Sequence, residues 1–195
     1  MVDHTTSKPN LAVKIYEKAS ELGVGSVDAP VSGGDVGAKE GKLVVMCGGE
    51  KEHWEMAKDI MEKYSRAVNL NGGPGMGQHT KMTNQIVLAG NMAGTVEGLI
   101  YASKAGLDLK QSIDTIVLGA ASSTVLNVLG RRMVDGNHDP GFYVEHYIKD
   151  LGIALEESDR MGLCLPCLAM IKQFYNALKA QGDGKLGTQA LIKVL

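Results

Sequence analysis

The stretch Gly72-Gly73-Pro74-Gly75-Met76-Gly77-Gln78-His79-Thr80-Lys81 separates two parts of this 195-residue sequence that follow different patterns. Up to about Gly73, short apolar runs that suit strands alternate with segments of helical spacing. From Met76 onward, the apolar residues recur only at helical spacing. The sequence therefore predicts a small α/β unit followed by an all-α domain.

Four strands and two helices are expected in the first part. The strands cover residues 2–3, 25–29, 43–47 and 67–70, and the helices cover residues 9–22 and 51–63. In the first helix, Ser7 is expected to act as the N-cap and Pro9 to lie in the first turn. The apolar residues of this helix that are expected to face the core are Leu11, Ile15, Ala19 and Leu22.

Six helices are expected in the second part, and they cover residues 80–105, 110–118, 124–132, 142–161, 166–181 and 187–195. On the first of them, Gly90, Gly94 and Gly98 recur every four residues. In a membrane, this spacing is typical of a dimerising seam. In this sequence, we expect instead that another helix of the chain crosses close to the glycines.

Composition and charge exclude several classes of protein. The formal net charge of −2 gives no electrostatic basis for binding nucleic acid or an acidic membrane surface. The longest apolar stretch, residues 86–102, is interrupted by Asn91, Thr95 and Glu97, so no membrane span is predicted. The three cysteines are too few for a secreted disulfide scaffold. A reducing compartment is therefore expected, either the cytoplasm or, if a transit peptide precedes the sequence, the mitochondrion.

Two motifs that suggest cofactor or redox chemistry lie in the wrong setting for it. The single G-x-G-x-x-G, residues 182–187, follows a predicted helix, whereas the dinucleotide fingerprint follows a strand. We interpret it as a turn before the last helix. Cys164 and Cys167 form a C-x-x-C pair with apolar flanks, which favours buried structural cysteines over a redox-active pair. The histidines show no ligand spacing, so no metal site is predicted.

A second stretch, Asp28-Ala29-Pro30-Val31-Ser32-Gly33-Gly34, has the pattern of a strand that ends in a glycine turn. Bare backbone N–H groups in such a turn are suited to holding a carboxylate. Downstream, Lys81 lies in the first turns of a predicted helix, where the positive end of the helix dipole disfavours a charged ammonium. Together these features suit acid/base chemistry on a small hydroxy acid.

Three blocks of sequence, residues 28–49, 75–85 and 140–151, carry a resemblance to a known family. With the stretch Asp3-His4-Thr5-Thr6-Ser7-Lys8-Pro9, they make the sequence similar to the β-hydroxyacid dehydrogenases. This is the family of 3-hydroxyisobutyrate dehydrogenase and tartronate semialdehyde reductase, and 6-phosphogluconate dehydrogenase is a more distant relative. The blocks occur in the family's order and span nearly the whole sequence.

The resemblance implies catalytic and substrate-binding roles for particular residues. Ser32, Gly33 and Gly34 would bind the substrate carboxylate through backbone N–H groups and the serine hydroxyl. Lys81 would be the general acid/base, taking the hydroxyl proton during oxidation and returning it during reduction. Asn84, one helical turn after the lysine, would orient the substrate.

Further roles follow from the same resemblance. Because family members differ over whether the third or fourth residue after the lysine is the asparagine, Gln85 is an alternative to Asn84 as the substrate-orienting residue. Thr6 would contact the nicotinamide ribose region of the cofactor. Lys149 would reach the cofactor near its nicotinamide end, with Asp150 as its structural partner.

The resemblance also implies an architecture and a cofactor. Residues 1–74 would be the C-terminal part of a Rossmann-type NAD(P)-binding domain, an α/β remnant. Residues 75–195 would be an all-helical substrate and dimerisation domain, like the C-terminal domain of 6-phosphogluconate dehydrogenase. The implied cofactor is NAD or NADP, and the implied assembly is a homo-oligomer, a dimer or tetramer formed through the helical domain.

The sequence departs from the family at its start. The family opens with a strand, a glycine fingerprint and a helix that hold the dinucleotide, and no such segment occurs in this sequence. A truncated NAD(P)-dependent oxidoreductase is therefore expected, one that interconverts a small 3-hydroxy acid and its semialdehyde. The alternative is a non-catalytic shortened isoform that acts as a dimerisation or interaction module.

Overall fold

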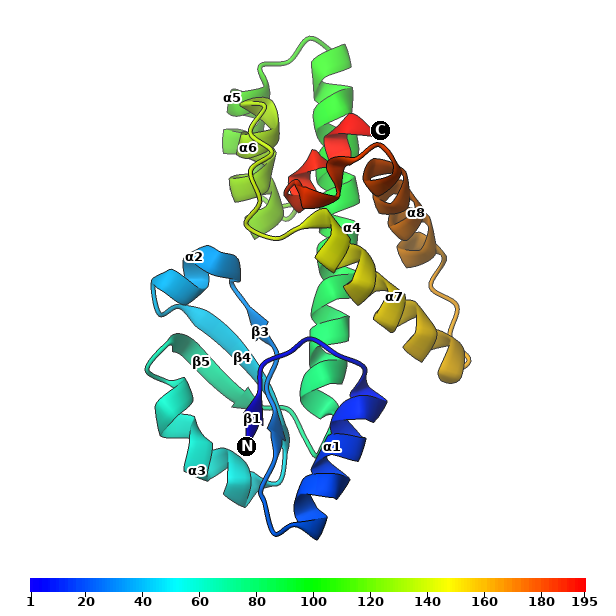
Figure 1. The fold of residues 1–195 in the computed structure, drawn as a ribbon. Coiled ribbons are helices and arrows are strands. Elements are labelled where there is room, and N and C mark those ends of the chain that lie inside the picture. Colours follow the sequence, from blue (N-terminus) through cyan, green and yellow to red (C-terminus); the bar gives the residue numbers. More distant parts are fainter. The chain divides into compact units, whose positions relative to one another are not determined.

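The computed structural model describes residues 1–195, and an α/β unit is followed by an all-helical unit, as predicted (Figure 1). Residues Met1–Asn84 form one compact unit and residues Gln85–Leu195 the other. The long helix α4 (Met76–Lys104) contributes its first turns to the first unit and the remainder to the second. None of the helices combines the length and the apolarity that a membrane span requires.

Strand β4 (Leu43–Gly49) is the centre of the sheet in the first unit, because other strands pair with both of its edges. Strand β5 (Ser65–Leu70) runs parallel to β4 along one edge. Strands β2 (Val27–Asp28) and β3 (Val31–Ser32) pair antiparallel with β4 along the other. Strand β1 (Val2–Asp3) completes the sheet as the parallel neighbour of β2.

Three helices accompany this sheet: α1 (Pro9–Glu21), α2 (Gly34–Lys39) and α3 (Lys51–Met61). The prediction that Ser7 caps α1 is wrong, because the helix begins at Pro9, as predicted, with Lys8 at the N-cap. The expected buried face is also partly wrong, since Leu11 and Leu22 are exposed while Ala12 and Ala19 are buried.

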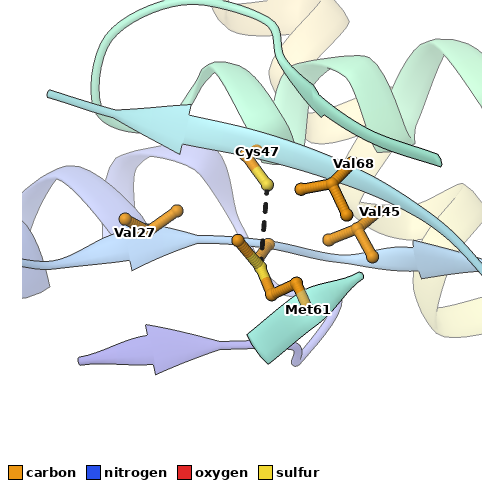
Figure 2. Close-up of a cluster of buried hydrophobic side chains, with 6 residues drawn as sticks. Val27, Val45, Cys47, Met61 and Val68 are labelled. Atoms are coloured by element: carbon orange, nitrogen blue, oxygen red, sulfur yellow. Dashed lines mark hydrogen bonds between the residues drawn. The ribbon is translucent and has the colours of Figure 1, made fainter. Parts of the chain in front are cut away.

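The core of the first unit consists of small and medium-sized apolar side chains from β2 and the residue that follows it, β4, β5 and α3 (Figure 2). Its members are Val27, Ala29, Val45, Cys47, Met61 and Val68. The Cys47 thiol lies 4.0 Å from the Met61 sulfur, and burial raises the pKa of this thiol to about 12. Cys47 is therefore a core residue that stays protonated and unreactive at neutral pH.

The second unit is entirely helical. After α4, its elements are α5 (Leu109–Ile116), the π-helical turn η1 (Val125–Gly130), α6 (Arg131–Val134), α7 (Val144–Arg160), α8 (Pro166–Ala180), and the 3₁₀ turns η2 (Asp183–Lys185) and η3 (Thr188–Lys193). The expected last helix is thus a 3₁₀ segment. Tyr147 of α7 and Tyr175 of α8 meet edge to face with ring centroids 5.0 Å apart. Tyr175 also donates a hydrogen bond to the carbonyl of Thr188 at 3.0 Å, which ties η3 to these helices.

The glycines Gly90, Gly94 and Gly98 do not mark a close helix crossing within this chain, so that prediction is wrong. A Cβ atom added at any of the three would have no neighbour within 4 Å. The buried residues of this part of α4, among them Ala89, Met92, Val96 and Leu99, face a different direction from the glycines. The glycine stripe is therefore an exposed face of α4.

A close approach does occur elsewhere on α4, at Gly77 in its first turn. A Cβ atom added at Gly77 would lie 2.5 Å from the carbonyl oxygen of Met46 and 2.6 Å from that of Asp28. A Cβ atom added at Gly48 would lie 2.5 Å from the backbone nitrogen of Gly77. The end of β4 and the start of α4 therefore touch backbone to backbone, and only glycine fits at either position.

Two matched substitutions on α4 test this difference in space. Gly77→Ala should lower the free energy of unfolding by about 1–3 kcal/mol, because the methyl group has no room. Gly94→Ala should raise it by about 0.5–1 kcal/mol, because alanine in an open helical position lowers the entropy of the unfolded chain. Urea unfolding followed by circular dichroism measures both, and effects of the same sign would contradict this packing.

Candidate active site

Helix α4 is capped by a side chain from a distant strand. Gly75 precedes the helix with a φ of 84° and has no side chain with which to cap it. The Asp28 carboxylate at the end of β2 accepts hydrogen bonds from the backbone N–H groups of Gly75 and Gln78, both at 2.8 Å. These are N–H groups that a helix cannot satisfy by itself. Asp28 thus does what an N-cap side chain ordinarily does.

Two opposing effects act on the Asp28 carboxyl group. Burial raises its pKa above the ordinary value of 3.8, because a charged carboxylate is disfavoured away from water. The hydrogen bonds from Gly75 and Gln78 act in the other direction, and burial is the larger effect. A negative charge at this place also offsets the positive end of the helix dipole, which by itself would disfavour a charged Lys81 ammonium.

Lys81 reaches the strand that leads into the predicted carboxylate-binding segment. The residue is only 7% exposed, and its Nζ donates a hydrogen bond to the carbonyl of Val31 at 2.9 Å. Val31 directly precedes Ser32, so Lys81 lies beside the segment from Ser32 to Gly34 although 50 residues separate the bonded pair in the sequence. The structure therefore brings these two predicted parts of the site together.

The segment from Ser32 to Gly34 does not form the simple turn that the sequence suggests. Val31 and Ser32 form the short strand β3, Gly33 is the N-cap of α2, and Gly34 begins that helix. Gly33 and Gly34 have φ values of 130° and 63°, a backbone region that favours glycine. Both glycines are exposed, and the first N–H groups of any helix are not used within the helix itself.

Asn84 and Gln85 are consecutive on α4 but differ in burial. Asn84 is half-buried and belongs to the first unit. Gln85 begins the second unit, is 1% exposed, and donates a hydrogen bond from Nε2 to Asp150 Oδ2 at 2.6 Å. Its backbone carbonyl accepts a hydrogen bond from the Tyr147 hydroxyl at 2.9 Å. The Gln85 side chain thus has a structural partner within the helical unit, while its role toward a substrate stays a prediction.

Lys149 and Asp150 form an ion pair at the surface of the helical unit. Lys149 Nζ lies 3.0 Å from Asp150 Oδ1, with the lysine side chain half exposed and the aspartate buried. Asp150 thus forms an ion pair with the neighbouring lysine through Oδ1 and accepts the hydrogen bond from Gln85 through Oδ2. Burial, with the nearby Asp150 charge, raises the pKa of the Tyr147 hydroxyl far above its usual range, so this group is a hydrogen-bond donor and not an acid.

Thr6 lies in the loop that follows β1. The Gln78 side chain forms hydrogen bonds with the residues before and after it. Gln78 Nε2 donates to the carbonyl of Thr5 at 2.7 Å, and Gln78 Oε1 accepts from the backbone N–H of Ser7 at 3.0 Å. Gln78 is completely buried. The sequence alone predicts no role for Gln78 or Asp28. However, Gln78, Lys81 and Gln85 recur at a helical spacing that indicates one common face.

Thr6 and Lys149, each described within its own unit, have settings compatible with a dinucleotide, whereas the G-x-G-x-x-G segment does not. Thr6 follows the carboxyl end of β1, which is parallel to β2, and ligands of α/β sheets bind at such ends. Lys149 offers a partly exposed cation suited to a phosphate or ribose oxygen. The G-x-G-x-x-G at 182–187 follows helix α8 and includes the 3₁₀ turn η2, so it lacks the strand that the fingerprint requires.

The C-x-x-C pair is not buried, so that prediction is wrong. Cys164 and Cys167 are both exposed free thiols. Cys164 lies in the loop before α8, and Cys167 lies in the first turn of that helix. The face that α8 buries consists of Leu168, Ile171, Tyr175 and Leu178, and both cysteines fall outside it.

Comparison with known proteins places both units in described families. Residues 75–195 match the family described as NAD-binding of NADP-dependent 3-hydroxyisobutyrate dehydrogenase. Residues 1–73 match the NAD binding domain of 6-phosphogluconate dehydrogenase.

Individual relatives agree with these matches. The chain is 50% identical over 195 residues to a probable 3-hydroxyisobutyrate dehydrogenase-like 1, mitochondrial, of Arabidopsis thaliana, covering 100% of this chain and 58% of that protein. It is 37% identical to the 2-hydroxy-3-oxopropionate reductase of Escherichia coli, covering 100% and 67%. The crystal structure of 3-hydroxyisobutyrate dehydrogenase from Salmonella typhimurium matches with a TM-score of 0.90 at 26% identity, covering 100% and 68%. The chain thus spans about three fifths to two thirds of the length of these relatives.

Removal of the Asp28 carboxylate tests the capping arrangement. Asp28→Ala should lower the free energy of unfolding by about 1–2 kcal/mol, because it leaves two buried N–H groups at the start of α4 without an acceptor. Asp59→Ala, at an exposed position of α3, is the matched control and should change the free energy by less than about 0.5 kcal/mol. Equal losses in the two variants, measured by urea unfolding, would contradict the role of Asp28.

Proposed function

Because this chain belongs to the β-hydroxyacid dehydrogenase family, we propose that it is an NAD(P)-dependent oxidoreductase that interconverts a small 3-hydroxy acid and its semialdehyde. The observation that carries the proposal is the buried Lys81 side chain, whose Nζ is 2.9 Å from the carbonyl of Val31 beside the glycine-rich start of α2. A lysine held in this way next to backbone N–H groups suits proton transfer to a substrate anchored by its carboxylate.

The substrate carboxylate would bind the segment from Ser32 to Gly34. The Ser32 hydroxyl and the N–H groups at the start of α2 are donors, and a helix N-terminus favours a negative charge. Exposure of Gly33 and Gly34 supports access of a ligand to this backbone. The same anchoring would bring the substrate hydroxyl toward Lys81.

Lys81 would move the proton. In the oxidation, its neutral amine takes the proton of the substrate hydroxyl group while the C–H bond of the carbon that carries this hydroxyl breaks. In the reduction, its ammonium returns a proton to the carbonyl oxygen of the semialdehyde. When bound, the nicotinamide supplies the chemistry of hydride acceptance and donation. Asn84 lies one helical turn from Lys81 and would orient the substrate with its amide.

Thr6 and Lys149 would contact the cofactor near its nicotinamide end. Thr6 is supported by its place after the carboxyl end of β1. Lys149 is supported by its partly exposed ammonium, which Asp150 orients at 3.0 Å. The chain would act in a reducing compartment, the cytoplasm or the mitochondrion, and its exposed free thiols support such a setting.

Replacement of the lysine tests the proposal. The 195-residue protein should bind NADH or NADPH saturably, measured by nicotinamide fluorescence, and should oxidise one member of a panel of small 3-hydroxy acids. Lys81→Met should then lower kcat by about two to four orders of magnitude, because the general acid/base is lost. Lys104→Met, at an exposed position of the same helix, should leave kcat unchanged. Unchanged turnover in Lys81→Met would refute the role of Lys81.

The glycine stripe favours a second candidate function, that of a dimerisation module in the helical unit. Gly90, Gly94 and Gly98 lie on an exposed face of α4 that also carries Val87 and Tyr101, which are 58% and 75% exposed. Small residues allow close approach of a second helix. An absence of dinucleotide binding at millimolar concentrations would favour this module over the enzyme.

The glycine face can be tested by the assembly of the protein. Gly94→Glu should shift a dimer to monomer in sedimentation equilibrium, because it places a charge and bulk where two helices would meet. Gln111→Glu, exposed on α5, should leave the dimer intact. A wild-type protein that sediments as a monomer, or a Gly94→Glu variant that remains dimeric, would exclude this face as the interface.

A further inference from the structure

The first turn of α4 is attached to two segments by one residue, Gln78. Its backbone N–H donates to Asp28 at the end of β2, and its side chain binds the loop after β1. Strands β1 and β2 are parallel neighbours, with Asp3 opposite Asp28. Both segments therefore leave the sheet at the same edge, and the buried Gln78 side chain lies between the loop and the helix.

The hydrogen bonds of the Gln78 side chain have the same pattern as those that a parallel partner strand would make. In a parallel ladder, one residue binds the carbonyl before and the N–H after the residue that it faces. The Gln78 carboxamide makes the same pair of bonds, to the carbonyl of Thr5 and to the N–H of Ser7. Thr6, between them, is thus held in a strand-like register beyond the end of β1 although no strand lies there.

We propose that Gln78 is a positioning residue that fixes the segment from Thr5 to Ser7, and with it Thr6, to the helix turn that precedes Lys81. The functional part of this inference rests on the proposed function, in which Thr6 contacts the cofactor and Lys81 moves the proton. The structural part does not, since it concerns only the order of the Thr5–Ser7 segment. Gln78 acts through these residues and touches no reacting atom itself.

The Gln78→Met substitution separates the side-chain role from the cap of the helix. Methionine nearly conserves the volume and keeps the backbone N–H that binds Asp28, but it removes both bonds to the loop. The amide hydrogen of Ser7 should then exchange about tenfold faster in NMR hydrogen exchange, which corresponds to the loss of one hydrogen bond. Amides elsewhere in the sheet, such as that of Asn71 directly after β5, which donates to the carbonyl of Cys47 at 2.8 Å, should keep their rates.

The Gln78→Glu substitution separates the two bonds from each other. At a pH above the raised pKa that burial gives this carboxyl group, its ionised form still accepts from the Ser7 N–H but presents an oxygen to the carbonyl of Thr5 in place of a donor. Exchange at Ser7 should therefore stay slow, while the ¹⁵N chemical shift of Thr6, which reports on the hydrogen bond to the carbonyl before it, should change. Gln111→Met, the same substitution as Gln78→Met at an exposed site of α5, is the matched control and should leave both readouts unchanged.

Kinetics test the functional part. In a protein that turns over, Gln78→Met should raise KM for the dinucleotide about three- to tenfold, because the loop must be ordered when the cofactor binds. The kcat value should change by less than about twofold, because Lys81 keeps its place. A structural defect alone would lower the active fraction, and hence the apparent kcat, and would leave KM unchanged.

Each result decides one part of the proposal. Unchanged exchange at Ser7 in Gln78→Met, or equal acceleration at all amides, would overturn the positioning role. Faster exchange at Ser7 with an unchanged KM for the dinucleotide would overturn its relevance for the cofactor. If the wild-type protein binds no dinucleotide, the proposed function and the functional part fail together, whereas the exchange data still decide whether Gln78 orders the loop.

Discussion

The first unit depends on one contact, the Asp28 carboxylate against the start of helix α4. Gly75 provides no side chain to cap the helix, so the acceptor for its first N–H groups comes from strand β2. Because the sheet fixes Asp28, the helix begins at a fixed point beside the end of that strand. Lys81 then reaches the carbonyl of Val31 without any further adjustment of the backbone. A structural anion thus determines where the proposed proton-transfer group lies.

Much of the fold could be predicted from the sequence, because hydrophobic periodicity is a local signal. The change from α/β to all-helical pattern after Gly73 is a clear example. Strand β3 and helix α2 could not be predicted in the same way, since a two-residue strand has no periodicity and Gly33-Gly34 suggests a turn. The glycine stripe of α4 predicts a helix crossing that the structure does not have, because spacing identifies a face but not what covers it.

The site could be predicted only in part. The roles of Lys81 and its neighbours rest on resemblance to a family and stay predictions, while the structure gives the hydrogen bond from Lys81 to Val31. The partners of the Gln78 and Gln85 side chains lie 65 to 73 residues away in the sequence, so no local pattern identifies them. What periodicity does provide is the common face of the two glutamines and Lys81. A buried polar stripe of this kind is a reason to search for distant partners.

The contact between Gly48 and Gly77 also has a consequence for how this sequence can change over evolutionary time. Most buried positions accept a larger amino acid when an adjacent side chain is replaced by a smaller one in compensation. Here the nearest opposing atoms belong to the backbone, and a backbone atom cannot be exchanged for a smaller one. No second-site substitution is therefore able to rescue a larger residue at either position. We therefore expect Gly48 and Gly77 to stay glycine, whereas the exposed glycines further along α4 are free to vary.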